Sequence, residues 1–291
     1  MTVATYAAAQ LLRVLPRERI TRAVGRLCDA RLHPVLSRVV VNLYSRAYSV
    51  DLDAAVPIEE PYESFDAFFT RALRDGIRPP CADPASVISP ADGRLHDAGP
   101  VVEGGELLVK GQPYRVAELV GDEAEAERYV GGQFAVIYLS PRDYHRVHSP
   151  VAGRITQIRS LPGDLYPVNS IGERHVPKLF SRNRRVAIVI DTPDRGRVTV
   201  VMVGAMIVGR ITVSAIDAHD VPLGDHTISP PVELNRGDEI GRFHLGSTAV
   251  MFVERDAAPV WNRPSGPILF GEPLHDPAST QGAPHGGDSE R

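Results

Sequence analysis

The sequence predicts an α+β fold, in which a helical N-terminal region (residues 1–75) precedes a β-rich body (residues 76–275). Apolar residues recur at helical spacing over residues 32–44, which predicts a helix. Near residue 85 the chain changes to short β-rich runs separated by Gly, Pro and Asp turns, which predicts a flattened barrel or sandwich. The composition of residues 276–291 predicts a disordered tail.

The first 50 residues predict amphipathic helices. The stripe has i, i+3, i+4, i+7 spacing and consists of Leu32, Val35, Leu36, Val39, Val40, Leu43 and Tyr44. A preceding apolar segment is interrupted by Pro16. Two interpretations stay open: the helices pack on their own domain, or one face lies in a membrane interface as an anchor.

The N-terminal region is also basic. Residues 1–50 carry eight arginines, no lysine and two acids, whereas the whole chain has a net charge of −4. A basic segment on an acidic body favours an anionic partner, and both phospholipid headgroups and nucleic acid qualify. The aliphatic content favours a membrane surface over nucleic acid. No stretch reaches the ~20 apolar residues of a bilayer span, and Arg13, Arg17 and Arg19 interrupt any signal-peptide core.

Residues 64–75 predict a short helix, with Ser64 as N-cap and Gly76 just beyond the C-terminus. The body that follows contains six predicted strands: Phe134–Leu139, Arg154–Ile158, Val186–Ile190, Val198–Val203, Ile207–Val213 and Ala249–Val253. The body resembles the flattened barrels of biotinyl and lipoyl carriers, but Gly204–Ile207 lacks the lysine that those carriers modify. The architectural likeness keeps a non-enzymatic, carrier-like module open as an alternative.

Several common cofactor sites are not predicted. The two cysteines, Cys28 and Cys81, have neither disulfide-framework nor metal-site spacing. Lys110 and Lys178 are the only lysines, and dinucleotide and Walker motifs are absent. A His-x-x-His pair suits a helix face, but His145 and His148 follow a β-like run and precede Pro150, so we expect no metal.

Three separated motifs supply the residue types of a nucleophilic triad. Asp92 lies in a Pro-Ala-Asp-Gly turn, His148 in Asp-Tyr-His-Arg-Val-His-Ser-Pro, and Ser247 in Leu-Gly-Ser-Thr. The Asp would orient the imidazole, the His would take the hydroxyl proton, and the Ser would attack. Because Gly246 has no Cβ, its carbonyl is open to attack by Ser247 itself. The alternative is a lipid-acting serine hydrolase with the triad intact, although a G-x-S-x-G elbow is absent.

Taken together, these motifs resemble the bacterial, membrane-associated phosphatidylserine decarboxylases. The resembling segments are Phe65–Leu73, Ser89–Leu95, Lys110-Gly111, Asp143–Pro150, Leu179–Asn183, Val203–Ala205 and Gly237–Thr248. They extend over about two-thirds of the chain, and the Leu-Gly-Ser-Thr match is complete. The chain departs from the family pattern at Ser149, Met206 and Arg210, beside the motifs.

The resemblance implies a proenzyme that cuts itself between Gly246 and Ser247 and converts Ser247 into a covalent pyruvoyl group. The products would be a β chain, residues 1–246, and an α chain, residues 247–291. The mature enzyme would convert phosphatidylserine to phosphatidylethanolamine and CO2. A related phosphoserine lipid stays open as the substrate.

The resemblance also implies roles for individual residues and partners. We expect Asp92 and His148 to serve self-cleavage, and His145 to contact the headgroup or protonate the product. Arg146, Arg182 and Asn183 are candidates for headgroup binding because they neighbour these motifs. The expected partner is phosphatidylserine in an anionic membrane surface, with the protein peripheral on the cytoplasmic face of the cell membrane. A homodimer stays open, and no nucleic acid is expected.

Overall fold

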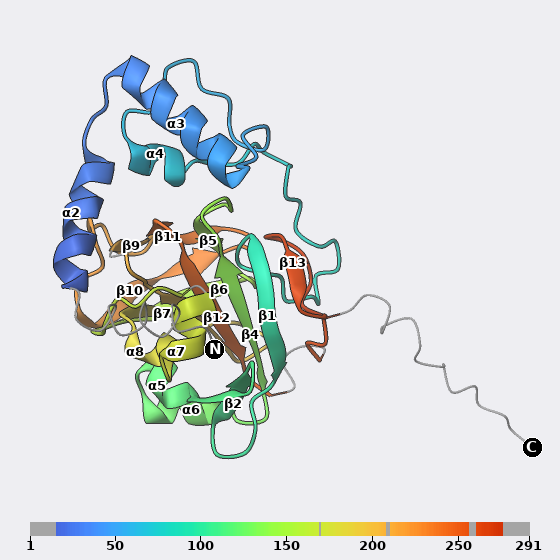
Figure 1. Ribbon diagram of the computed structural model, residues 1–291. Helices are drawn as coiled ribbons and strands as arrows, with labels where there is room; N and C mark the ends of the chain where they lie inside the picture. The colour runs from blue at the N-terminus through green and yellow to red at the C-terminus, as the bar shows by residue number, and fades with distance from the viewer. Residues whose placement is uncertain (1–15, 169, 208–209, 256–259, 276–291) are drawn as a thin grey trace, which may run out of the picture.

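The computed structural model describes residues 16–168, 170–207, 210–255 and 260–275. Within these residues the fold is α+β, as predicted: helices α2 (Arg17–Asp29), α3 (Pro34–Tyr48) and α4 (Phe65–Phe69) form a layer beside a β-rich body (Figure 1). The predicted disordered tail, residues 276–291, lies outside the described residues.

An eight-stranded antiparallel sheet forms the centre of the body, with strand order β10-β6-β7-β8-β12-β4-β1-β13. The strands are β1 (Gly93–Pro100), β4 (Gln133–Leu139), β6 (Gly153–Leu161), β7 (Arg185–Asp191), β8 (Arg197–Val203), β10 (Gly224–Leu234), β12 (Ser247–Val253) and β13 (Gly266–Ile268). All seven residues of β12 are buried. Near-continuous apolar runs predict strands covered on both faces, and β7, β8 and β12 have that composition.

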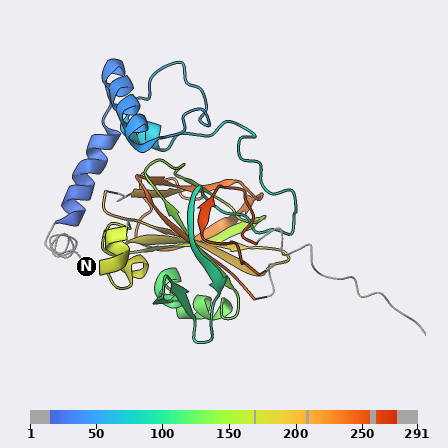
Figure 2. The ribbon, with the colours of Figure 1, turned by 45° about the vertical axis from the view of Figure 1, so that its right-hand side comes forward.

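A three-stranded sheet, β5 (Arg146–His148), β11 (Glu239–His244) and β9 (Arg210–Val213), lies between the large sheet and the helices (Figures 1 and 2). His148 is therefore on a strand, and it is not on a helix face, in agreement with its place before Pro150. Strand β9 begins later than the predicted Ile207–Val213 run, because Ile207 has a φ of 76°, outside the β region.

The smaller elements gather at the end of the body opposite helices α3 and α4 (Figure 1). They are the hairpin β2 (Glu106–Val109) and β3 (Gln112–Arg115), and the short helices α5 (Val116–Val120), α6 (Glu123–Arg128), α7 (Ser170–His175) and α8 (Leu179–Arg182).

The helix predicted over residues 64–75 is wrong at its C-terminal end. Ser64 caps α4 as predicted, since its Oγ accepts from the Ala67 amide at 3.1 Å. The helix ends at Phe69, however, because the following residues pair with an earlier segment of the chain. The Val56 amide donates to the Ala72 carbonyl, and the Arg74 amide donates to the Ala54 carbonyl. A tertiary backbone pairing thus replaces the last helical turns.

Several of the apolar side chains of helix α3 point away from the body. Its buried side chains are Ser37, Val41 and Ser45, whereas Val35, Leu36, Val39 and Leu43 are 50–69% exposed. The inward face is held by polar contacts such as the Ser37 hydroxyl, which donates to the Tyr62 carbonyl at 2.6 Å. The fold therefore leaves much of the predicted apolar stripe in contact with solvent. Among the described residues, the helices are all too short or too polar to span a bilayer.

Candidate active site

Leu245 and Gly246 connect β11 of the small sheet to β12 of the large sheet. Leu245 is buried and has a φ of 86°, a left-handed backbone conformation that residues other than glycine rarely adopt. Ser247 then starts β12 opposite Leu139 of β4. The Ser247 Oγ is buried and has no hydrogen-bond partner among the described residues. An unsatisfied buried hydroxyl costs roughly 1–3 kcal/mol. Ser45, Thr156 and Thr248 also have one, and Ser247 differs from them in following a glycine peptide.

His145 is the histidine beside this connection. The Phe243 amide of β11 donates to the His145 carbonyl at 3.0 Å, which brings the two segments together near the end of β11. A Cβ placed on Gly246 would lie 3.5 Å from His145 Nε2. His145 Nδ1 lies 2.8 Å from the Asp143 carbonyl oxygen, which can only accept, so Nδ1 carries the hydrogen. In the neutral ring Nε2 is then a free base, and it has no described hydrogen-bond partner.

The surroundings of His145 keep its ring neutral. Its side chain is fully buried and lies against the Phe69 ring. Burial, opposed by the hydrogen bond to Asp143 and assisted by the charge of Arg71, lowers the pKa of His145 from 6.5 to about 3. At neutral pH the His145 ring is therefore neutral, with the lone pair of Nε2 unprotonated. The unfolded chain binds this proton below about pH 6.5, so this group lowers stability increasingly as the pH falls from there toward 3.

Both ring nitrogens of His148 have hydrogen-bond partners, unlike those of His145. Its Nδ1 donates to the Gly237 carbonyl at 2.8 Å, and its Nε2 accepts from the Tyr144 hydroxyl at 2.9 Å. Its ring stacks on Phe270, with 3.9 Å between the centroids. Burial is the main cause that lowers the pKa of His148 below its ordinary value. The nitrogen expected to act as a base is thus occupied by a tyrosine hydroxyl.

Asp92 also has other partners. Its Oδ2 accepts from Arg78 at 3.1 and 3.3 Å, and its Oδ1 accepts from the Phe270 amide at 2.8 Å. Burial raises the pKa of Asp92, although these hydrogen bonds and the Arg78 charge act in the opposite direction. Asp92 and His148 therefore both contact Phe270: Asp92 accepts from its amide, and the His148 ring stacks on its ring. No hydrogen bond links Asp92, His148 and Ser247 among the described residues, so their roles stay predictions.

A cavity of about 320 Å³ adjoins the Leu245–Gly246 connection. Its lining is largely apolar and comes from the end of α3, the end of β4 and the segments around residues 141, 167 and 206: Tyr48, Tyr138, Leu139, Pro141, Pro167, Val168, Ala205, Met206, Ile207, Leu245 and Gly246. Ligand sites are typically concave, largely apolar and about 300–1,000 Å³ in volume, so this cavity is the candidate active site.

The three residues expected to bind a headgroup do not line this cavity. Arg146 donates to the Thr70 carbonyl and pairs with Glu239 at 2.8 Å. Arg182 lies over the Tyr166 ring, 5.0 Å from its centroid. Asn183 is fully buried, and its amide group bonds only to backbone atoms of Tyr166 and Gly204. Their role in binding is untested and stays a prediction.

Sequence reasoning missed the side chains that surround the predicted residues. Tyr144 lies inside the motif that suggested the histidines, but a tyrosine beside a histidine carries no spacing signal. Arg78 and Phe270 come from segments with no motif. His244 belongs to the Gly237–Thr248 segment, and only the fold shows that it contacts Asp66 at 2.8 Å.

The described residues contain no cluster of three or more histidine, cysteine or acidic side chains arranged to hold a metal ion. Both Cys28 and Cys81 are free thiols. The groups gathered beside the Leu245–Gly246 connection are a buried hydroxyl, a neutral imidazole and a glycine carbonyl.

Comparison with known proteins identifies the family. The model of the phosphatidylserine decarboxylase family matches residues 65–275. The chain is 43% identical to the phosphatidylserine decarboxylase proenzyme of Pseudomonas paraeruginosa, over 82% of this chain and 85% of the relative. It is 43% identical to that of Azotobacter vinelandii (84% and 87%) and 38% identical to that of Acinetobacter baylyi (90% and 92%). The matched residues include Asp92, His145, His148 and Ser247, and the chain belongs to the phosphatidylserine decarboxylase family.

Proposed function

We propose that this protein decarboxylates phosphatidylserine to phosphatidylethanolamine and CO2, after cutting its own chain between Gly246 and Ser247. Family membership supports the reaction, and the word proenzyme in the names of the relatives supports the processing. The observation that carries the cleavage site is the buried, unpartnered Ser247 hydroxyl beside a glycine peptide.

Self-cleavage needs only atoms of this chain and water. The Ser247 Oγ attacks the Gly246 carbonyl carbon, the peptide C–N bond breaks, and an ester replaces the amide. A base then removes the Ser247 α-proton, and the Gly246 carboxylate leaves. The dehydroalanine that remains takes up water and loses ammonia to become the pyruvoyl group. Leu139 and the apolar residues near it limit access of bulk water to the ester.

The site fits a pyruvoyl group. Its precursor atoms are the buried Ser247 side chain and backbone, and the free Nε2 of His145 lies nearby. Once formed, the ketone would supply an electron sink for loss of CO2 from the substrate. His145 Nε2 lies beside this site as a neutral base. If the charge of a bound headgroup offsets the burial that lowers the pKa of His145, Nε2 would take a proton from the substrate ammonium and return it to the substrate α-carbon after CO2 leaves.

Two histidines compete for the base in self-cleavage, and single variants distinguish them. If Asp92 and His148 act as predicted, then His148→Gln and Asp92→Asn accumulate the uncut chain, whereas His145→Gln still cleaves. This requires Tyr144 to release His148. The reverse pattern would assign the base to His145, whose Nε2 the structure leaves free. Gel electrophoresis of the three variants after equal times of synthesis gives the answer, with loss of one catalytic base slowing cleavage about 10²-fold or more.

We also propose that α3 docks the enzyme on the anionic cytoplasmic face of the cell membrane. The support is an outward face made of Val35, Leu36, Val39 and Leu43, with Arg38 and Arg46 on the same helix. Apolar side chains would enter the interface while arginines meet lipid phosphates. The end of this helix also contributes Tyr48 to the cavity next to Gly246. A lipid headgroup could therefore reach the site while its acyl chains stay in the bilayer.

Replacing Val39 and Leu43 together with Asp is expected to reduce binding to phosphatidylserine-containing vesicles at least tenfold. Burial of each such side chain contributes roughly 1.5–3 kcal/mol, and the new charges are repelled by the lipid. Co-sedimentation measures the bound fraction. Leu108→Asp is the matched control, because Leu108 is 55% exposed on β2, at the other end of the body. Equal binding of the double variant and wild type would disprove docking through α3.

A further inference from the structure

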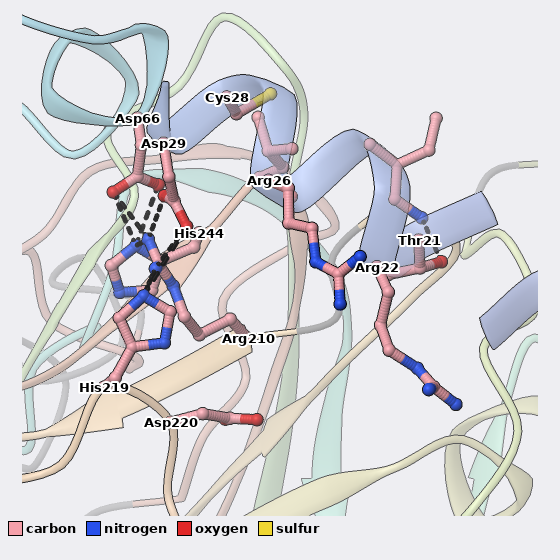
Figure 3. Close-up of a pocket in the computed structure, with 13 residues that line it drawn as sticks. Thr21, Arg22, Arg26, Cys28, Asp29, Asp66, Arg210, His219, Asp220 and His244 are labelled. Atoms are coloured by element: carbon pink, nitrogen blue, oxygen red, sulfur yellow. Dashed lines mark hydrogen bonds and ion pairs between the residues drawn. The ribbon is translucent and has the colours of Figure 1, made fainter. Parts of the chain in front are cut away.

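A cluster of charged side chains joins the helical layer to the strand that precedes the cleavage site (Figure 3). Asp29 ends α2, Asp66 lies in α4, Arg210 begins β9 and His244 ends β11. His244 is two residues before Gly246. The four side chains line a second cavity, of about 250 Å³, which shares Ile207 and Leu245 with the cavity at the cleavage site.

His244 is held on both sides of its ring. Its Nδ1 lies 2.8 and 2.9 Å from the two carboxylate oxygens of Asp66, and its Nε2 lies 3.1 Å from the Thr212 hydroxyl. Arg210 Nη2 also lies 2.7 Å from Nδ1, but a nitrogen cannot donate to Asp66 and accept from Arg210 at once. Because the Asp66 carboxylate only accepts, Nδ1 carries the hydrogen and donates to Asp66.

Arg210 ties this pair to α2. It makes two contacts of 2.8 Å with the Asp29 carboxylate and one of 2.7 Å with Asp66, and it also contacts His219. Burial opposes ionisation of Asp66, but the hydrogen bonds and charges of His244 and Arg210 together hold its pKa below the ordinary value. The cluster is therefore charged at neutral pH. It fastens two helices to the end of β11.

The neighbouring residue shows why such a fastening is needed. Leu245 is a buried, branched residue at a φ of 86°, a conformation that costs about 1–3 kcal/mol and persists only where the surroundings enforce it. On its far side Ser247 is fixed in the ladder between β4 and β12. On its near side His244 pairs with Arg210 across β11 and β9, and the charged cluster adds the side-chain contacts.

We propose that Asp66, His244 and Arg210 are positioning residues for self-cleavage: they hold the Leu245–Gly246 peptide at the Ser247 hydroxyl. This inference rests on the self-cleavage proposed above. It makes the helical layer part of the maturation machinery as well as a surface, because α2 and α4 supply both carboxylates. The cluster touches no reacting atom and acts only through the backbone of residues 244–246.

The test is the rate at which the full-length chain, made by cell-free synthesis, converts to two fragments on denaturing gels. We expect Asp66→Asn and His244→Leu to slow conversion at least tenfold. His244→Asn is the informative conservative variant, since its side-chain NH2 can replace Nδ1–H as the donor to Asp66. It should cleave at close to the wild-type rate, whereas a general packing role would make both His244 variants slow. Circular dichroism checks that each chain is folded, and if Asp66→Asn does not fold, the His244 pair decides.

Glu254→Gln is the matched control. Glu254 pairs with Arg128 just beyond the opposite end of β12. The variant therefore removes an ion pair between two elements but leaves the Leu245–Gly246 connection unchanged. Wild-type rates in Asp66→Asn and His244→Leu, with Ser247→Ala uncut, would overturn the positioning role and leave self-cleavage intact. A His244→Asn chain as slow as His244→Leu would overturn it as well. A wild-type chain that never splits would instead refute the proposed function.

Hydroxylamine locates the affected step, because it cleaves an ester but not the peptide. We expect it to leave the slow variants slow, since positioning acts before the ester forms. Restoration of the wild-type rate by hydroxylamine would show that the ester forms normally, and would overturn the inference.

Discussion

Ser247→Ala is expected to remain a single chain of full length and to have no decarboxylase activity. Alanine removes the only oxygen that can attack Gly246 from the adjacent residue, and it removes the atom from which the cofactor carbonyl arises. The fold should survive, because Ser247 Oγ makes no hydrogen bond in the described structure and its loss removes an unsatisfied polar group.

Intact mass measurement under denaturing conditions tests this expectation. Wild-type protein should give two chains divided between Gly246 and Ser247, with the smaller one lighter by one ammonia than a fragment that begins with serine. Ser247→Thr is a useful companion, since it keeps a hydroxyl and adds only a methyl group. A wild-type chain that stays whole and is labelled at Ser247 by a fluorophosphonate would instead support the lipid-acting serine hydrolase.

His145→Gln is expected to lower kcat for phosphatidylserine by about 10²–10⁴, counted per pyruvoyl group. Glutamine is polar and fills part of the same space, but it cannot gain and lose a proton near neutral pH. His145 Nε2 is fully buried, has no hydrogen-bond partner among the described residues and is the titratable atom nearest to Gly246. KM should change less than kcat, because the role assigned to His145 is proton movement.

The measurement is CO2 release from phosphatidylserine in detergent micelles, with pyruvoyl content determined on the same sample. His226→Gln is the control, since His226 is on β10 and its described side-chain hydrogen bond is to the Pro222 carbonyl. A His145→Gln enzyme with full pyruvoyl content and unchanged kcat would remove His145 from the reaction.

The α+β fold could be predicted because its signals are local. Alternating and continuous apolar runs indicated β4, β7, β8 and β12, and the helical stripe indicated α3. The boundary of α4 could not be predicted, since it depends on pairing between residues 54–56 and 72–74. Whether α3 turned its stripe inward also depended on contacts such as Ser37 with Tyr62, which are distant in sequence.

The candidate site was predictable in its residue types and less so in its connections. Ser247 and Gly246 are adjacent in sequence, so their chemistry can be derived without a fold. The relation between His145 and His148 cannot, because His145 lies just before β5 and His148 at its end, and the two rings have different surroundings. His145 lies beside Gly246, whereas His148 stacks on Phe270, a residue far along the chain. Asp92 shows the same limit, since its partners Arg78 and Phe270 belong to no motif.

The place of β12 in the middle of the large sheet has a consequence for the lifetime of the enzyme. The proposed cleavage would make residue 247 a new chain end, yet the strand behind it is hydrogen-bonded to β8 on one edge and β4 on the other. Releasing the fragment would require the sheet to open at its centre. If the chain makes its prosthetic group as proposed, each molecule would keep that one group for life, and a chemically damaged group could not be replaced by exchange with another molecule. Renewal of activity then depends on new synthesis of the whole chain.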